Sequence, residues 1–276
     1  MSQDAFGLTL PRGLAAQTSA NLARLVADIT GQPDSLDALP YLAPALLFED
    51  QAAQQRLAFP QGDSGTILVQ EYQGINYDGP FPQNESMTVR ASTNHRGGAV
   101  EYDFVLSSSP GYDCARLKTA LRVLPTAEFT ALKPTHFRKE VLDQTTQSRE
   151  IAISQDAVDR YLVLSGDRNP IHTAQGATQY AGLTRPVVPG LLLVSLIQPY
   201  CQIAQPGLHL ISLKTRFLAP LFVAQPLWVA LQQRGTDSKT GNARMRAYLL
   251  GSGGQAMAIT DLVFGDPPES GAAEPV

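Results

Sequence analysis

Two pairs of short sequence stretches recur within the chain at nearly the same separation. Residues 79–89, GPFPQNESMTV, align without a gap on residues 219–229, APLFVAQPLWV, which lie 140 positions later. Residues 105–115 align on residues 248–258 at an offset of 143, which makes the hairpin of the second copy three residues longer. Two such matches indicate that one structural unit occurs twice. We therefore expect a helix packed on an antiparallel sheet in each half of the chain.

Hydrophobic periodicity predicts the elements of the two halves. Helices are expected at residues 14–29, 155–163, 174–180 and 190–203. β-rich runs occupy residues 67–70, 87–92, 99–106 and 117–124 in the first half, and residues 208–217, 227–234, 243–250 and 255–264 in the second. Ser154 is the expected N-cap of the helix that follows it. Residues 31–65 show no regular pattern, and we expect them to be irregular with a few extended pieces.

These patterns divide the chain into two units of similar size. The first unit spans residues 1–125, and residues 126–148 have the mixed composition of a linker. The second unit spans residues 149–265, and the polar tail at 266–276 is expected to be disordered. The predicted fold class is α+β, with antiparallel sheets and packed helices.

Composition excludes several classes of function. The net charge of −4 and the absence of a Lys or Arg run argue against a nucleic-acid partner or an anionic membrane surface. Two distant cysteines and four histidines suggest neither a disulfide framework nor a metal cluster. The longest apolar stretch, residues 187–197, is interrupted by Pro189 and too short to span a bilayer. We expect a cytoplasmic protein that acts on a small molecule or contacts another protein.

The loop at residues 165–172, SGDRNPIH, carries the strongest candidates for chemistry. Pro170 ends the preceding helix and biases Asn169 toward extended geometry, so Asp167 and His172 share one tight turn. A carboxylate beside an imidazole can hold and activate a water at neutral pH. From these residues alone, helix capping and Asx-turns are the commoner roles. Signatures of serine hydrolases, P-loop proteins and dinucleotide-binding folds do not occur in the sequence.

The segment LSGDRNPIHT, followed by ATQYAGLTRPVVPGLLLVSLI, resembles the hydratase motif of the MaoC-like, (R)-specific enoyl-CoA hydratase and dehydratase family. The resemblance is close over residues 151–221 and fainter up to residue 264. It implies the hot-dog fold of that family, in which a sheet wraps around a long helix. The first half resembles the non-catalytic repeat of double hot-dog members, and it has no second GDxNPxH motif. The resemblance therefore implies a double hot-dog with one active site per chain.

The same resemblance assigns roles to four residues. Asp167 and His172 correspond to the catalytic pair of the family, and Asn169 to a supporting residue of the loop. The backbone N–H of Gly190 corresponds to the donor that binds the thioester oxyanion. The implied substrate is an acyl thioester of CoA or acyl carrier protein, and no cofactor is expected beyond the CoA or phosphopantetheine that the substrate carries. The family usually has His before the helix glycine, and here that residue is Pro189.

The sequence assigns no role in the site to a further group of residues. Where some relatives place a serine behind the catalytic pair, this chain has Gln198, or Ser195 one turn earlier. Basic residues that could meet the phosphates of CoA are Arg168, Arg185, Lys214 and Arg216. Residues expected to pack in the core rather than line the acyl pocket are Leu191, Leu192, Leu193, Val194, Leu196, Tyr72 and Tyr77.

Three functions remain open at this point. The first is a hydro-lyase that interconverts trans-2-enoyl and (R)-3-hydroxyacyl thioesters. The second is a catalytically degenerate hot-dog module that binds an acyl thioester or a partner subunit, as the missing His before Gly190 would allow. The third is a thioesterase on the same fold. A double hot-dog can complete its site within one chain, and it can also form a homodimer.

Overall fold

The structure is a computed structural model. It describes residues 7–10, 14–33, 39–49, 57, 60, 65–79, 87–108, 112–137 and 139–266. The tail beyond residue 266 and most of the predicted repeat segment at residues 79–89 lie outside the described residues.

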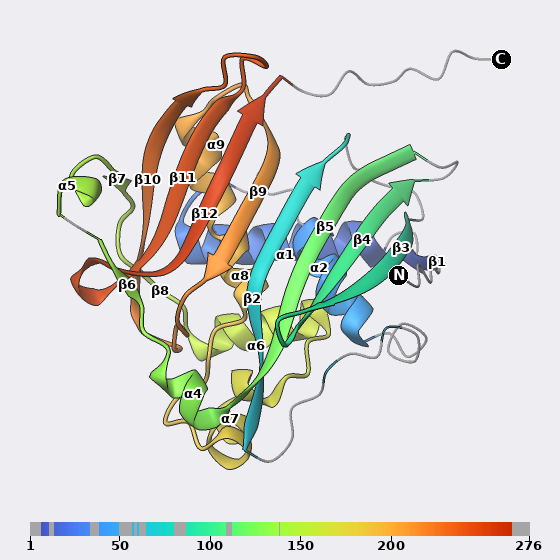
Figure 1. The fold of residues 1–276 in the computed structure, drawn as a ribbon, viewed down its shortest axis with the longest axis vertical. Helices are drawn as coiled ribbons and strands as arrows, with labels where there is room; N and C mark the ends of the chain where they lie inside the picture. Colours follow the sequence, from blue (N-terminus) through green and yellow to red (C-terminus); the bar gives the residue numbers. More distant parts are fainter. Residues whose placement is uncertain are drawn as a thin grey trace.

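The strands form one sheet that runs through both halves of the chain (Figure 1). The strands of the N-terminal half are β1 (Gly7–Leu10), β2 (Thr66–Tyr77), β3 (Met87–Arg96), β4 (Ala99–Ser108) and β5 (Tyr112–Pro125). Those that follow are β6 (Thr135–His136), β7 (Thr146–Gln147), β8 (Ile151–Ala152), β9 (His209–Phe217), β10 (Pro226–Thr236), β11 (Ala243–Gly251) and β12 (Gln255–Gly265). Their order is β1-β3-β4-β5-β2-β9-β12-β11-β10-β7, with β6 beside β12 and β8 beside β10.

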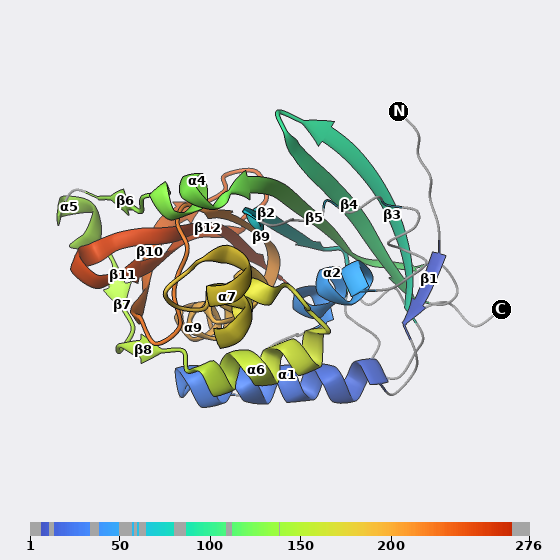
Figure 2. The same cartoon turned by 90° about the horizontal axis from the view of Figure 1, so that it is seen from below.

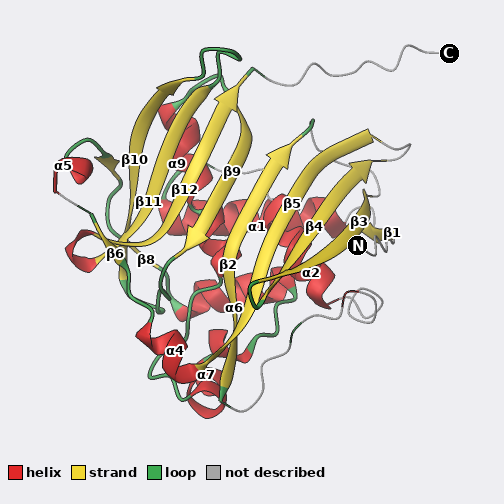
Figure 3. Ribbon diagram, viewed as in Figure 1, coloured by secondary structure: helices red, strands yellow, loops and turns green. Residues whose placement is uncertain are grey.

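The main helices pack against one face of this sheet (Figures 2 and 3). They are α1 (Leu14–Thr30), α2 (Leu39–Glu49), α6 (Gln155–Ser165), α7 (Ala174–Ala181), α8 (Gly190–Ser195) and α9 (Ile197–Ala204). The short helix α4 (Thr126–Ala131) follows β5, and α5 (Lys139–Leu142) packs beside Tyr248 on the opposite face of the sheet. Two 3₁₀ turns are η1 (Pro170–His172) and η2 (Ser252–Gly254). Figure 2 shows α1 and α6 as the layer farthest from the sheet, with α2 and α9 between. The predicted α+β class is confirmed.

The two halves of the sheet have the same strand order outward from the centre. The central pair is β2 with β9, and it is flanked by β5 and β12, then β4 and β11, then β3 and β10. In the central pair Gly74 lies opposite Lys214, and these positions are 140 residues apart, as in the sequence alignment. The register therefore has an approximate two-fold centre at Gly74 and Lys214.

Irregularities of the two halves also fall at matching places. The β4–β5 ladder shifts register after Leu106, and the β11–β12 ladder shifts after Leu249, 143 residues later. The β2–β5 ladder has an extra residue at Glu71, and the β9–β12 ladder has one at Ile211, 140 residues later. A β-bulge re-aims the side chains on either side of it. The halves thus share their bulges as well as their strand order.

Buried hydrogen bonds join the helices of the two halves inside the core. Tyr41 of α2 donates its hydroxyl hydrogen to Oε1 of Gln198 on α9, and both side chains are buried. Tyr200 of α9 donates to the backbone oxygen of Thr30 at the end of α1, over 3.2 Å. Through Gln198 and Tyr200, α9 is therefore bonded to α2 and α1 of the N-terminal half.

Two predictions about secondary structure need correction. Residues 39–49, which the sequence predicts to be irregular, form the helix α2, and this helix contains Pro44. A buried helix need not show an amphipathic pattern, so hydrophobic periodicity does not reveal it. The expected helix at 190–203 is divided at Leu196 into α8 and α9. Pro199 causes this break, since it cannot donate to the carbonyl of Ser195.

The predicted linker at residues 126–148 contains α4, α5, β6 and β7. Two of these elements join the sheet, because β6 pairs with β12 and β7 pairs with β10. Ser154 is confirmed as the N-cap of α6, where its side chain accepts from the N–H of Ala157. Within the described part of the chain, no helix has the length and apolarity needed to cross a membrane.

Tyr41→Phe is expected to lower the free energy of unfolding by about 1–3 kcal/mol, because it leaves the buried amide oxygen of Gln198 without its donor. The double variant Tyr41→Phe/Gln198→Leu removes both polar groups and should recover part of this loss. Urea unfolding followed by circular dichroism measures both. Equal stability of Tyr41→Phe and the wild type would contradict the importance of this hydrogen bond.

Candidate functional site

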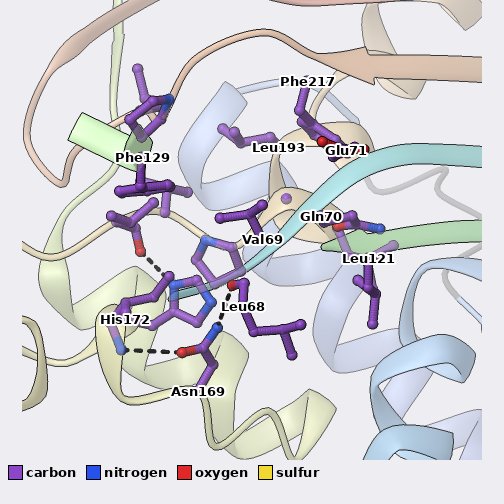
Figure 4. A pocket seen from close by; sticks show the side chains of 18 of the residues that line it. Leu68, Val69, Gln70, Glu71, Leu121, Phe129, Asn169, His172, Leu193 and Phe217 are labelled. Atoms are coloured by element: carbon purple, nitrogen blue, oxygen red, sulfur yellow. Dashed lines mark hydrogen bonds between the residues drawn. The ribbon is translucent and has the colours of Figure 1, made fainter. Parts of the chain in front are cut away.

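A cavity of about 580 Å³ lies where the two halves of the chain meet (Figure 4). Its walls come from β2 and β5 of the N-terminal half and from the loop after α6, the start of α8 and the end of β9. Apolar side chains line much of it, among them Leu68, Leu121, Phe129, Leu191, Leu193 and Phe217. The polar residues Gln70, Asp167, Asn169 and His172 also reach it. A largely apolar cavity with a few polar groups is the usual form of a small-molecule site.

The loop that carries the candidate residues is shaped by its own hydrogen bonds. Gly166 ends α6 in the left-handed conformation, with φ of 69°, which turns the chain toward the cavity. The side chain of Asn169 accepts from the N–H of Ile171 at 3.4 Å, and so caps the 3₁₀ turn. Its Nδ2 donates to the backbone oxygen of Leu68 on β2 at 3.2 Å. Asn169 thus fixes the loop to the other half of the chain.

The ring orientation of His172 determines which nitrogen can act as a base. Nδ1 lies 2.6 Å from the backbone oxygen of Val187. A carbonyl oxygen can only accept, so Nδ1 carries the hydrogen and Nε2 of the neutral ring has a lone pair. The ring is only 8% exposed, so this tautomer is held within the protein rather than by solvent.

The lone pair of Nε2 faces a carboxylate. Asp167 Oδ2 lies 3.6 Å from His172 Nε2, while Oδ1 accepts from the N–H of Asn169 at 2.9 Å. Two acceptors at this separation need a donor between them, and a water molecule has two O–H groups to give. The arrangement can therefore orient a water at the cavity wall and take a proton from it.

Residues of α6 support the loop from behind. Ser165 is buried, and its Oγ accepts from the N–H of Asp167 at 3.2 Å. Tyr161 forms a hydrogen bond with Ser165, and burial raises the pKa of Tyr161 well above its ordinary value, as does the nearby Asp167. Its phenol therefore stays protonated and can donate. Gln155 donates from Nε2 to the backbone oxygen of His172 at 3.0 Å.

Gly190 lies at the start of α8 and lines the cavity. The first N–H groups of a helix have no acceptor within the helix, so they can bind a negatively charged oxygen. A Cβ at Gly190 would lie 2.5 Å from Oε1 of Gln70 and 3.1 Å from Cζ of Phe217. The absence of a Cβ therefore lets the side chains of Gln70 and Phe217 come close to the start of the helix.

The structure brings all four predicted site residues, Asp167, Asn169, His172 and the Gly190 backbone, to one cavity. Of the basic candidates only Arg168 lines it, whereas Arg185 lies over the ring of Phe222 with its guanidinium carbon 5.3 Å from the centroid. Lys214 and Arg216 of β9 are exposed and do not line this cavity.

Two leucines expected only in the core also line the cavity. They are Leu191 and Leu193, and both remain buried. Neither Tyr72 nor Tyr77 is among the described residues that line it. Sequence reasoning missed Gln70 altogether, although extending the 140-residue offset back along β2 would have paired this glutamine with Leu210.

Among the described residues, no three His, Cys, Asp or Glu side chains lie close enough together to hold a metal ion.

The chain is similar to known proteins described as MaoC-like. The family model described as MaoC like domain matches residues 137–250. A solved structure titled MaoC-like dehydratase is 13% identical, with a TM-score of 0.66 over 96% of this chain and 99% of the other. A MaoC-like dehydratase from Phytophthora capsici is 16% identical, with a TM-score of 0.63 over 95% of each chain. No curated protein sequence matches the chain.

Thioesterases share the fold as well. An acyl-ACP thioesterase from Bacteroides thetaiotaomicron has a TM-score of 0.57 and 9% identity over 96% of this chain and 100% of the other. At these identities the likenesses show the fold, which is hot-dog-like.

Asn169→Ala is expected to loosen the loop, because it removes the acceptor for the Ile171 N–H and the donor to the Leu68 carbonyl. We expect a loss of about 1–3 kcal/mol in the free energy of unfolding. Hydrogen–deuterium exchange should rise in residues 166–173 more than in the strands. Asn169→Asp keeps the acceptor and loses the donor, so it separates the two contacts. Unchanged exchange in the alanine variant would show that Asn169 does not hold the loop.

Proposed function

We propose that the chain hydrates trans-2-enoyl thioesters and dehydrates (R)-3-hydroxyacyl thioesters, a proposal that the match of residues 137–250 to the MaoC like domain model supports. The acyl group would be carried by CoA or by an acyl carrier protein. The observation that carries this proposal is the pair of acceptors, Asp167 Oδ2 and His172 Nε2, 3.6 Å apart at the wall of a largely apolar cavity.

In the proposed reaction the pair holds a water over the double bond. The water oxygen bonds to the β-carbon while His172 Nε2 takes one of its protons, and Asp167 stabilises the imidazolium that forms. The electron pair of the double bond moves toward the thioester, which becomes an enolate. The proton held by His172 then passes to the α-carbon on the same face. Dehydration follows the same steps in reverse.

The negative charge on the thioester oxygen is the main electronic difficulty of this reaction. The Gly190 N–H at the cavity wall can donate to that oxygen, and the low polarity of the cavity strengthens the interaction. Pro189 precedes it as the N-cap, with φ of −58° and no side-chain cap. A proline at this position still leaves the Gly190 N–H in place.

The domain organisation is part of the same proposal. Residues 1–125 and 149–265 would form two hot-dog repeats, with the reacting groups on the second. Three observations support it: the common strand order, the matching bulges at Glu71 and Ile211, and the two-fold register at Gly74 and Lys214. The site would then be complete within one chain, since β2 of the first repeat forms a wall of the cavity.

A second function, thioester hydrolysis, is favoured by one observation, the likeness to an acyl-ACP thioesterase. Hydrolysis would release a free thiol, whereas hydration leaves the thioester intact. Incubation with saturated and unsaturated acyl-CoA, followed by a thiol-reactive dye, distinguishes the two. Thiol release with both substrates would favour the thioesterase, because hydration releases no thiol.

The purified protein is expected to remove the absorbance of crotonyl-CoA or a longer enoyl-CoA. Asp167→Asn and His172→Ala should each lower kcat at least about a hundredfold, because the first removes the charge that stabilises the imidazolium and the second removes the base. Far-UV circular dichroism should be unchanged in both. Chiral analysis of the product should give the (R)-3-hydroxyacyl thioester.

Matched controls for these variants are Asp143→Asn and His209→Ala, because both side chains are exposed and neither residue lines the cavity. They should keep wild-type activity. Full activity in both site variants would contradict the mechanism, and binding of acyl-CoA without turnover at any chain length would favour the degenerate binding module.

Gly190→Ala tests the helix start separately from proton transfer. The added methyl group lies 2.5 Å from Gln70 Oε1, so it should displace that side chain into the cavity and disturb the thioester oxygen. We expect kcat/KM to fall at least about tenfold. Stability should change little, because alanine favours the helix by up to about 1 kcal/mol over glycine. Wild-type kcat/KM in this variant would contradict the role of the Gly190 backbone.

A further inference from the structure

Gln70 reaches the cavity from the half of the chain that lacks the hydratase motif. It lies on β2 just before the bulge at Glu71. Side chains three apart on a regular strand point to opposite faces, but the extra residue of a bulge brings them to the same face. Gln70 and Gln73 therefore lie side by side, and Gln70 Nε2 donates to Gln73 Oε1 at 2.9 Å.

The neighbours of Gln70 determine which end of its amide faces the cavity. Gln73 Nε2 donates to the backbone oxygen of Gly74 at 3.0 Å, so its oxygen points the other way. That oxygen accepts from Thr119 Oγ1 at 2.7 Å and from Gln70. Gln73 and Thr119 are both completely buried, so these bonds are shielded from water. Gln70 must give its nitrogen to Gln73 and turn its oxygen toward Gly190.

The other half of the chain provides an internal comparison. At the same positions relative to its own bulge, β9 has Leu210 and Leu213, and β12 has Leu262 opposite Leu213. In β2 and β5 the corresponding residues are Gln70, Gln73 and Thr119. Three leucines are the simpler way to fill such a core, because buried polar groups cost free energy unless all are hydrogen-bonded. Of these corresponding positions, only those on β2 and β5 carry polar side chains, and β2 is the strand that faces the loop of Asp167 and His172.

The position of Gln70 relative to the other groups indicates which part of a thioester it meets. In the proposed reaction the α- and β-carbons lie at Asp167 and His172, and the thioester oxygen lies at Gly190. Figure 4 shows Gln70 and Phe217 on the side of the pocket away from His172 and Asn169. Along the substrate, the carbonyl carbon follows the β- and α-carbons, and the sulfur and the pantetheine arm come after it. Its first hydrogen-bond donor is an amide N–H, three bonds from the sulfur.

We infer that the Gln70 side-chain oxygen accepts a hydrogen bond from this pantetheine amide, and that Gln70 is a specificity-determining residue for pantetheine thioesters. The inference rests on the proposed function for the orientation of the substrate. CoA and acyl carrier protein both present this amide, so Gln70 recognises the arm that they share. Gln73 and Thr119 act as positioning residues, because they hold the Gln70 amide in this orientation without touching the substrate.

The test compares two saturated ligands that differ in one donor. S-(2-acetamidoethyl) butanethioate carries the amide N–H, and S-(2-acetoxyethyl) butanethioate has an ester oxygen in its place. Calorimetry should show that the wild type binds the first about five- to tenfold more tightly, the value of one hydrogen bond. Gln70→Leu, which copies Leu210 of the other half, should bring this ratio close to one.

Two further variants support the measurement. Thr119→Val removes the hydroxyl that donates to Gln73 and keeps the shape of the side chain, so it should reduce the ratio less than Gln70→Leu and serves if that variant fails to fold. Gln179→Leu, at an exposed position of α7, should leave the ratio at its wild-type value.

The outcomes separate this inference from the proposed function. A wild type that binds both ligands equally, or a Gln70→Leu variant that weakens both by the same factor, overturns the assignment of Gln70. Turnover of the matching enoyl thioesters is measured alongside. Loss of the ratio in Gln70→Leu without any hydration by the wild type would support Gln70 as the pantetheine contact and contradict the hydratase proposal alone.

Discussion

The pairing of β2 with β9 is the constraint on which the site depends. It joins the two halves into one sheet, with Gly74 opposite Lys214, and it brings the first part of β2 to the loop after α6. That part of β2 supplies the carbonyl of Leu68, which accepts from Asn169, and the Gln70 side chain near Gly190. A hot-dog unit without a second sheet edge beside it would lack this wall. In the proposed double hot-dog, two such units in one chain would fix the wall in place without an association equilibrium.

The two halves contribute different chemistry to one cavity. The C-terminal half provides Asp167 and His172, whose orientation is set by backbone groups of Asn169 and Val187. The N-terminal half provides apolar wall residues and one fixed amide oxygen on Gln70. In the proposed function only the C-terminal half carries the reacting groups. The polar side chains of the N-terminal half are then left to recognise the substrate.

Much of the fold could be predicted from the sequence, because alternation of apolar residues along β3, β4, β10 and β11 reports burial of one strand face directly. The helix α2 could not, since it is apolar on most sides and contains Pro44. At the site, the short-range turn at Asp167 and His172 could be read from Pro170 and its neighbours. Gln70 could not be found this way, because its role follows from a bulge and from a contact with a helix more than a hundred residues away.

The replacement of the usual histidine by Pro189 is compatible with this arrangement. Pro189 is the N-cap of α8, where no N–H is required from it, and its carbonyl accepts from Leu193. The backbone donor at Gly190 is therefore unaffected by the change. In the proposed reaction the change removes a polar side chain beside the thioester. In its proposed role, Gln70 supplies a polar group from the opposite wall of the cavity at the start of α8. This residue of the N-terminal half thus offsets the loss.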